Sequence, residues 1–252
     1  PPKISGNVVH HRDTINSNVN VNNLSFTTTE KLLIDYYKKK YWNSAVVGNI
    51  NNLRIIDNFK FPLYWNNIGI TTNSKLINIH LLSKEAQMVS TIFNSNSGFK
   101  YQITAIRRNE NHYVYAMYLL KREELKSRNG HVDEIHVFHG TKRENVNSIC
   151  NKNFDWRRFG QCTGHRFGQG VSFTPKPTYA IHYCNKGQRK TMFLAKVLIS
   201  EAINGHNDMS IPSDYLKGKI KFYDTSVKPN IDVIVKYGDN EFYPLYIIDL
   251  LT

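Results

Sequence analysis

The chain of 252 residues is poor in cysteine and contains no long hydrophobic run. Three cysteines, an odd number, argue against a disulfide framework and are typical of a reducing compartment. No apolar segment approaches the roughly 20 residues of a membrane span, and no early basic segment followed by an apolar one resembles a signal peptide. We therefore expect an intracellular protein, nuclear or cytoplasmic, with no membrane partner.

Acidic residues are also scarce, because 20 aspartates and glutamates face 33 lysines and arginines, which gives a net charge of +13. Such a surface favours anionic partners, among them nucleotides, nucleic acid, acidic proteins and anionic lipid. A basic surface without a specific partner is the alternative, and charge does not decide between the two. Hydrophobic residues make up 40% of the chain, which is enough to bury a core.

The sequence lacks the regular alternation of strand and helix that a doubly wound parallel sheet requires. Its apolar periods mix both kinds of element, which predicts an α+β fold built on antiparallel sheets. One helix is expected at 83–93, with Ser83 as N-cap and Met88 on the apolar face, and another at 111–127. Strands are expected at 99–108, 135–139, 170–174, 192–200, 232–237 and 244–251.

The first part of the chain has a different composition. Residues 1 to about 28 are polar, rich in asparagine and without a helical or strand period, which is typical of a flexible arm. Lysines and aromatic residues alternate in DYYKKKYW at 35–42, a pattern that fits either nucleic-acid binding or the solvated end of a helix. We therefore divide the chain into an N-terminal extension, 1–60, and a domain at 61–252.

Cysteine and histidine spacing raises two kinds of chemistry. Cys162-x-x-His165 and His182-x-Cys184 could supply zinc ligands, but the second pair lies in a predicted helix, where residues two apart point to different faces. We therefore predict no metal site. Cys150 is expected to lie on the packed face of a short helix rather than to act as a nucleophile.

Two glycines bracket a glutamine in FGQGVSF at 167–173. The third glycine and the following helix of a dinucleotide fingerprint are missing, so a Rossmann site is excluded. Glycine does let a backbone come close to another group. We expect this turn to form one bare wall of a slot, with VFHGT at 137–141 as a second part and the rings of Tyr179 and Tyr183 as aromatic faces. Such a slot would suit a planar heteroaromatic carboxamide.

Six segments follow one another in a distinctive order: HVFHGT (136–141), NFDWRRFG (153–160), FGQGVSF (167–173), TYAIHY (178–183), MFLAKVL (192–198) and YPLYIIDLL (243–251). Together they resemble the catalytic domain of poly(ADP-ribose) polymerase-type ADP-ribosyltransferases, in particular its mono-ADP-ribosylating branch. The resemblance covers about three quarters of the chain, from Phe61 onward. It implies the ADP-ribosyltransferase fold, with two packed, mainly antiparallel sheets, flanking helices and an NAD cleft.

The resemblance also implies an activity and its partners. Enzymes of this kind split NAD at the nicotinamide–ribose bond and pass ADP-ribose to an acceptor, which we expect to be a protein, the enzyme itself or a nucleic acid. His139 would bind a ribose hydroxyl, Gly140 would hold the carboxamide through its backbone, and Tyr183 would stack on the nicotinamide ring. The residues expected to contact NAD are His139, Gly140, Thr141, Arg157, Gly170, Phe173, Ala180 and Tyr183.

A loop from about Trp156 to Phe167 matches the family's donor loop, which covers the dinucleotide. Because the diphosphate of NAD is anionic, Arg157, Arg158 and Arg166 in this loop are expected to be its partners; solvated loop charges are the alternative.

The sequence departs from the family pattern inside the slot. Ser172 stands where the pattern has a tyrosine, and Ala180 stands where it has a serine that helps to hold the carboxamide. Stacking of a base on an aromatic ring is worth on the order of 1–3 kcal/mol. Weaker NAD binding is therefore expected, unless Phe173 or Tyr179 supplies a ring.

A third departure concerns the position that is glutamate in polymer-forming enzymes and often aliphatic in the mono-transferring branch. Counting back from Tyr246 assigns it to Val233, whereas a slip of one residue would assign it to Asp232 and reverse the face that looks into the cleft. We favour Val233, which makes the catalytic triad His139, Ser172 and Val233. Without a carboxylate there, polymer synthesis is not expected.

Two functions therefore remain. The first is an NAD-dependent mono-ADP-ribosyltransferase that uses NAD as substrate and needs no metal. The alternative is a catalytically inactive module of the same fold that binds ADP-ribose or nucleic acid.

Overall fold

The computed structural model describes residues 59–65, 73–95, 101–160, 166–212, 215–216, 219–220 and 222–251. The chain divides into two units, Pro1–Arg54 and Ile55–Thr252, and every described residue belongs to the second. The arm expected at 1–28 and the segment at 35–42 lie outside the described residues. The domain boundary at residue 61 therefore stays a prediction.

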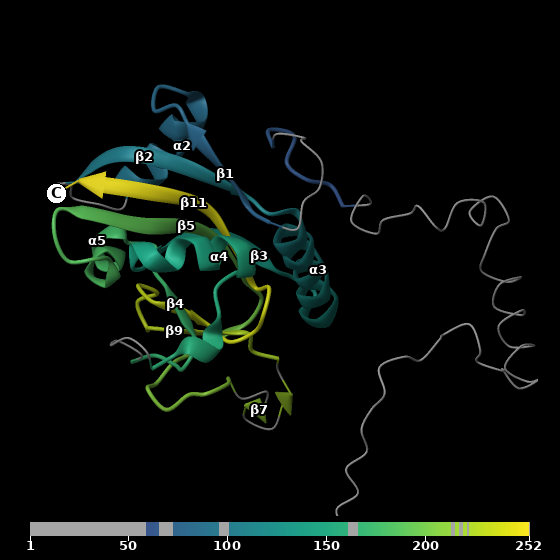
Figure 1. Cartoon of the computed structure of the whole chain (residues 1–252). Coiled ribbons are helices and arrows are strands. Elements are labelled where there is room, and N and C mark those ends of the chain that lie inside the picture. Colours follow the sequence, from purple (N-terminus) through teal and green to yellow (C-terminus); the bar gives the residue numbers. More distant parts are fainter. Residues whose placement is uncertain are drawn as a thin grey trace, which may run out of the picture. The chain divides into compact units, whose positions relative to one another are not determined.

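The larger sheet is five-stranded and antiparallel throughout, in the order β1-β2-β11-β5-β3. Figure 1 shows β2, β11 and β5 lying side by side. The C-terminal strand β11 is central, and its residues Phe242–Ile248 are all buried, which explains why it reads as a continuous apolar run. The strands are β1 (Lys75–Ile79), β2 (Gln102–Glu110), β3 (Asp133–Gly140), β5 (Arg189–Ile199) and β11 (Phe242–Leu251).

A proline lies inside this central strand. The register between β11 and β5 shifts between Pro244 and Tyr246, so the strand is irregular where the proline could not donate a ladder hydrogen bond. The carbonyl of Pro244 accepts a hydrogen bond of 2.9 Å from the side chain of Asn109 on β2. From Tyr246 to Leu251 the strand pairs with both neighbours.

The smaller sheet has four strands in the order β4-β10-β9-β6, of which only β6 and β9 are parallel. Two backbone hydrogen bonds between Phe138 and Thr174, of 2.7 and 3.0 Å, connect the end of β3 to the residue after β4. The two sheets thus meet beside His139. The strands are β4 (Val171–Phe173), β6 (Ala202–Asn204), β9 (Thr225–Val227) and β10 (Ile234–Lys236), and a separate hairpin joins β7 (Tyr215–Leu216) to β8 (Lys219–Ile220).

Four α-helices complete the described part of the chain and confirm the predicted α+β class. Ser83 caps α2, because its hydroxyl accepts a hydrogen bond from the amide of Ala86. Met88 is 47% exposed, so its place on the buried face was wrong: the buried residues Ala86, Val89 and Phe93 follow the helical period, and Met88 lies outside it. The helices are α2 (Lys84–Ser95), α3 (His112–Asn129), α4 (Val146–Lys152) and α5 (Pro177–Ala180), with 3₁₀ turns η4 (Arg143–Asn145), η5 (Trp156–Arg158) and η6 (Ile181–Tyr183). In the described ranges no helix is both long and apolar enough to cross a bilayer.

Successive side chains of the large sheet alternate between two apolar clusters, as the pleat of a strand requires. Leu194 and Ile248 pack with Phe93 and Tyr118 from the helices α2 and α3. On the other face, Phe193 packs in a cluster that contains residues of both sheets. The second cluster is therefore the layer between the sheets, and the side chains beside His139 belong to it.

Candidate active site

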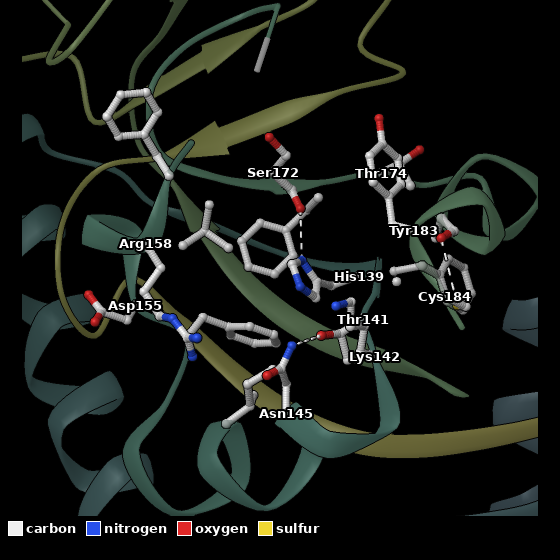
Figure 2. A pocket seen from close by; sticks show the side chains of 18 of the residues that line it. His139, Thr141, Lys142, Asn145, Asp155, Arg158, Ser172, Thr174, Tyr183 and Cys184 are labelled. Atoms are coloured by element: carbon white, nitrogen blue, oxygen red, sulfur yellow. Dashed lines mark hydrogen bonds between the residues drawn. The ribbon is translucent and has the colours of Figure 1, made fainter. Parts of the chain in front are cut away.

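A cavity of about 900 Å³ opens where β3, β4, α4 and the α5–η6 segment meet. Figure 2 shows the imidazole of His139 in its middle. Ten residues were selected from the sequence as site residues, and all ten line this one cavity: His139, Gly140, Thr141, Arg157, Gly170, Ser172, Phe173, Ala180, Tyr183 and Val233. Their roles toward NAD stay predictions.

His139 is fixed by its neighbours at the end of β3. Its Nδ1 lies 3.0 Å from the backbone carbonyl oxygen of Ser172, as Figure 2 shows. The imidazole packs edge-on against Phe154, with 4.9 Å between the ring centroids, and lies beside Phe173 at 5.6 Å. The ring is therefore held on three sides by the layer between the sheets.

The protonation of His139 follows from these contacts. A carbonyl oxygen can only accept, so Nδ1 carries the hydrogen and Nε2 keeps a lone pair in the neutral ring. Burial lowers the pKa of His139, although the hydrogen bond to Ser172 opposes this effect. At neutral pH the imidazole is thus a hydrogen-bond acceptor at Nε2, which suits a sugar hydroxyl.

Gly140 must be glycine because another segment of the same chain packs directly against its backbone. A Cβ atom at this position would lie 1.9 Å from the carbonyl oxygen of Ala180 and 3.1 Å from the Cβ of Tyr183. Real Cβ atoms do not come this close to a backbone oxygen, so α5 can rest against β3 only over a glycine. This contact holds Tyr183 beside His139, although 44 residues separate them.

Gly168 and Gly170, the two glycines of the Gly-Gln-Gly turn, also contact other parts of the chain closely. Gly168 has a φ of +142°, and a Cβ there would lie 1.7 Å from the hydroxyl of Tyr237. At Gly170 a Cβ would lie 2.2 Å from the carbonyl oxygen of Lys236 on β10. We expected this turn to be a bare wall for a ligand, which was wrong for Gly168: it packs against the small sheet and is not among the cavity residues.

The register between β4 and β10 bears on the third triad position, which stays a prediction. Ser172 lies directly opposite Val235, and Val233, just before β10, belongs to the same apolar cluster as Val235. Val233 is buried and lines the cavity. Asp232 instead forms ion pairs with Lys176, at 2.6 Å, and with Lys228, at 3.8 Å, and is not among the cavity residues. The register favours Val233.

Aromatic rings occupy two parts of the cavity wall. Phe173 is 1% exposed and packs between Phe154 and Phe242, at 5.1 and 5.6 Å, so it is held in the core and cannot turn into the slot. Tyr179 and Tyr183 lie one turn apart with ring centroids 5.8 Å apart and tilted by 46°. Burial and the hydrogen bond with Tyr179 raise the pKa of Tyr183 to about 12, so its phenol is neutral.

Thr141 extends the site toward α4. Its hydroxyl accepts a hydrogen bond of 3.2 Å from the side chain of Asn145, which also lines the cavity (Figure 2). Asn145 and Phe154 were not predicted from the sequence. Asparagine is common throughout this chain, and an isolated phenylalanine carries no signal of a site, so neither could be selected from the sequence.

The expected diphosphate partner Arg157 is already paired. Its guanidinium forms two hydrogen bonds to Asp239, of 2.5 and 3.0 Å, and one of 3.1 Å to Asp155, and it stacks over the ring of Trp156. These carboxylates raise the pKa of Arg157, whose side chain stays 56% exposed. Basic residues still outnumber acidic ones around the cavity, because Arg158 and three lysines line it too. Residues 161–165 of the expected donor loop lie outside the described residues.

The cysteine and metal alternatives gain no support from the described residues. Cys162 and His165 lie outside them, and His182 is exposed on η6. In the ranges that are described, no group of three or more His, Cys, Asp or Glu side chains is placed to hold a metal ion. Cys150 is buried as predicted, and burial raises the pKa of its thiol to about 12, which makes it a poor nucleophile.

Comparison with known proteins gives information that is independent of the geometry of the cavity. A model of the family described as the poly(ADP-ribose) polymerase catalytic domain matches residues 83–249. The chain is 30% identical over 238 residues to human protein mono-ADP-ribosyltransferase PARP12, covering 91% of this chain and 33% of that protein. It is 30% identical over 213 residues to human protein mono-ADP-ribosyltransferase PARP11, covering 75% of this chain and 62% of the relative. The chain thus spans less than two thirds of either human relative.

Proposed function

Because the chain belongs to the poly(ADP-ribose) polymerase catalytic domain family, we propose that it transfers single ADP-ribose units from NAD to an acceptor and releases nicotinamide. The proposed acceptor is a protein, including the enzyme itself, with nucleic acid as a second candidate. The proposed site needs no metal, and we place the protein in the nucleus or the cytoplasm.

One observation carries this proposal: the imidazole of His139 and the ring of Tyr183 line the same cavity although they come from separate segments. The close contact of Gly140 with Ala180 holds these segments together. A carboxamide bound along the backbone of Gly140 would lie beside the ring of Tyr183. The ribose would then reach His139, and the diphosphate would meet the basic residues of the rim.

In the proposed reaction, the bond between the ribose carbon and the nicotinamide nitrogen breaks, and its electron pair stays on the nitrogen. The positive charge of the pyridinium ring moves to the sugar, which is oxocarbenium-like in the transition state. A nucleophile of the acceptor then forms a bond to the same carbon and gives up its proton. A neutral His139 holds the ribose through a hydroxyl without adding a second positive charge.

Val233 supports transfer of single units. A chain-forming enzyme must activate a hydroxyl of an ADP-ribose that is already attached, and a valine at this position offers no carboxylate for that purpose. The names of the relatives also favour transfer over the alternative of an inactive binding module.

Labelled NAD tests the proposal directly. We expect incubation to give a labelled protein band. Phosphodiesterase, which cuts the diphosphate, should release AMP from the product and no phosphoribosyl-AMP, the fragment that a link between two units would give. His139→Ala should abolish the label, whereas His131→Ala, which removes an exposed histidine after α3, should retain it. An unlabelled wild-type protein at every NAD concentration would leave the binding module, and a ladder of lengthening products would contradict the role given to Val233.

A further inference from the structure

Ser172 leaves room on one side of the slot, and the register shows which side chains border that room. Directly opposite residues of antiparallel strands have Cβ atoms about 4.5–5.5 Å apart. The side chain of Ser172 therefore lies next to that of Val235, with Val233 on the same face. Tyr179 packs against the apolar cluster that contains both valines. Its ring thus reaches the face on which Ser172 has no ring.

Two other aromatic residues that are near Ser172 in the sheet, Phe173 and Tyr237, cannot take this place. Phe173 follows Ser172 in the strand, so it points to the opposite face, and it is buried between the sheets. The hydroxyl of Tyr237 forms hydrogen bonds with Ser226 and with the carbonyl of Phe167 behind Gly168, and Tyr237 is not among the cavity residues. Tyr179 is half-buried and does line the cavity.

The backbone of Tyr179 is held on both sides of its short helix. Pro177 occupies the first turn of α5, and the ion pair of Lys176 with Asp232, at 2.6 Å, ties the start of this helix to the residue before Val233. On its other side α5 rests on Gly140. Only the side chain of Tyr179 is therefore left to adjust to a ligand.

The spacing of the two tyrosines shows that an adjustment is needed. A flat ring between two others needs about 7 Å, which is twice the van der Waals distance between carbon atoms. The rings of Tyr179 and Tyr183 are 5.8 Å apart and tilted by 46°. A flat ligand can therefore lie between these two rings only after they move apart.

We propose that Tyr179 is the second aromatic wall of the nicotinamide slot and replaces the ring that is absent at Ser172. This inference rests on the proposed function. The tyrosines touch each other in the free protein, and the ring of Tyr179 turns toward Ser172 when a nicotinamide or benzamide ring enters. The slot then holds its ligand between Tyr179 and Tyr183.

Calorimetric titration with benzamide, a neutral mimic of nicotinamide, and with NAD tests the proposal. We expect Tyr179→Ala to weaken the binding of both ligands roughly 10- to 100-fold, because it removes one stacked ring. Tyr179→Phe keeps the ring and should bind within about threefold of the wild type. The double variant Tyr179→Ala with Ser172→Tyr should recover most of the loss. Tyr113→Ala, on the exposed side of α3, is the matched control and should bind as the wild type does.

The outcomes separate this inference from the proposed function. If Tyr179→Ala binds normally while Tyr183→Ala and His139→Ala lose binding, the slot is real and the role of Tyr179 is wrong. If Tyr183→Ala and His139→Ala also bind normally, the proposed function itself fails. If Tyr179→Ala loses binding and the added Ser172→Tyr does not restore it, Tyr179 acts by supporting the structure of the site. That result would overturn the proposal that its ring replaces the one absent at Ser172.

Discussion

The two sheets of this domain are stabilised in different ways. The five-stranded sheet packs apolar side chains on both faces, and its central strand is almost wholly buried. Its buried ion pair, Arg108 with Glu110, and its close glycine contact, Gly140 with Ala180, lie at the ends of β2 and β3. The four-stranded sheet contains a fully buried lysine, Lys236, which forms ion pairs with Asp224 and with Glu241, the latter at 3.2 Å. It also depends on Gly168 and Gly170, which meet their neighbours at distances that admit no side chain.

This difference shows how the fold separates stability from recognition. Apolar burial is tolerant of detail, because a slightly different side chain still removes area from water. Buried ion pairs and glycine contacts are not, since one changed atom leaves a charge unpaired or a backbone displaced. The cavity lies where the end of β3, with Gly140, meets the small sheet, so contacts of the less tolerant kind border it.

The largest effect is expected from Lys236→Met in the small sheet. It leaves the buried carboxylates of Asp224 and Glu241 without their cation, and breaking such a group costs about 3–5 kcal/mol. Urea unfolding measures the loss. Adding Asp224→Asn and Glu241→Gln to Lys236→Met should recover part of it, and a single variant as stable as the wild type would refute the contrast.

Leu194→Ala in the large sheet is expected to cost about 2–5 kcal/mol, with a centre near 3, because it removes a fully buried side chain. Its cluster packs against α2 and α3 on the face of the sheet opposite to the layer that holds His139, although Ala180 of the cavity wall also belongs to it. The folded variant should therefore keep its affinity for benzamide. Leu251→Ala, at the partly exposed end of β11, is the control and should change the stability little.

Gly140→Ala should lower both the stability of the domain and its affinity for benzamide. The new Cβ would overlap the carbonyl oxygen of Ala180, and overpacking of this kind costs about 1–3 kcal/mol. Displacement of α5 should also weaken benzamide binding at least tenfold. Gly130→Ala tests the specificity: its Cβ would meet nothing, so it should cost only the strain of a positive φ and leave binding unchanged.

Low pH should weaken NAD binding by protonating His139. Burial lowers the pKa of this imidazole below its usual 6.5, so the neutral ring persists at pH 6.5 and becomes protonated only at lower pH. Protonation removes the acceptor at Nε2 and places a positive charge beside the cationic nicotinamide. NAD affinity should thus be constant above pH 6.5 and fall by up to about tenfold per pH unit below the lowered pKa. A loss centred above pH 6.5 would contradict this prediction.

The smallest effect is a gain in stability at Ile231, which has a φ of +59° and is 57% exposed. A β-branched residue is strained in the left-handed region, whereas asparagine tolerates it. Ile231→Asn should therefore raise the free energy of unfolding by about 0.5–1 kcal/mol, measured by thermal unfolding. Ile231→Val keeps the branch and should give no gain.

Local pattern predicted the elements because periodic burial leaves a trace in the sequence. Ser83 was identified as an N-cap, and Tyr118 and Leu125 on α3 follow a helical period and are buried. Met88 was wrongly assigned to the buried face. The sequence shows that Met88 is apolar, but it does not show that its neighbour Val89 faces the core instead.

The site could be selected from the sequence only in part. Ten of the residues that line the cavity were identified through the order of six segments, since a family pattern preserves positions that a ligand requires. The ion pairs of Arg157 with Asp155 and Asp239 were not, because Asp239 is 82 residues away and nothing in the sequence relates the two charges.

The sequence by itself determined the class of the fold, the composition of the strands and the positions at which glycine is needed. Only the tertiary structure decided what each glycine meets, which of Asp232 and Val233 lines the cavity, and which tyrosine ring packs against the cluster of Val233 and Val235. The physical reason is that propensity and periodicity act between neighbours in the chain. Close contacts and unlike charges act between segments that meet only after both sheets have formed.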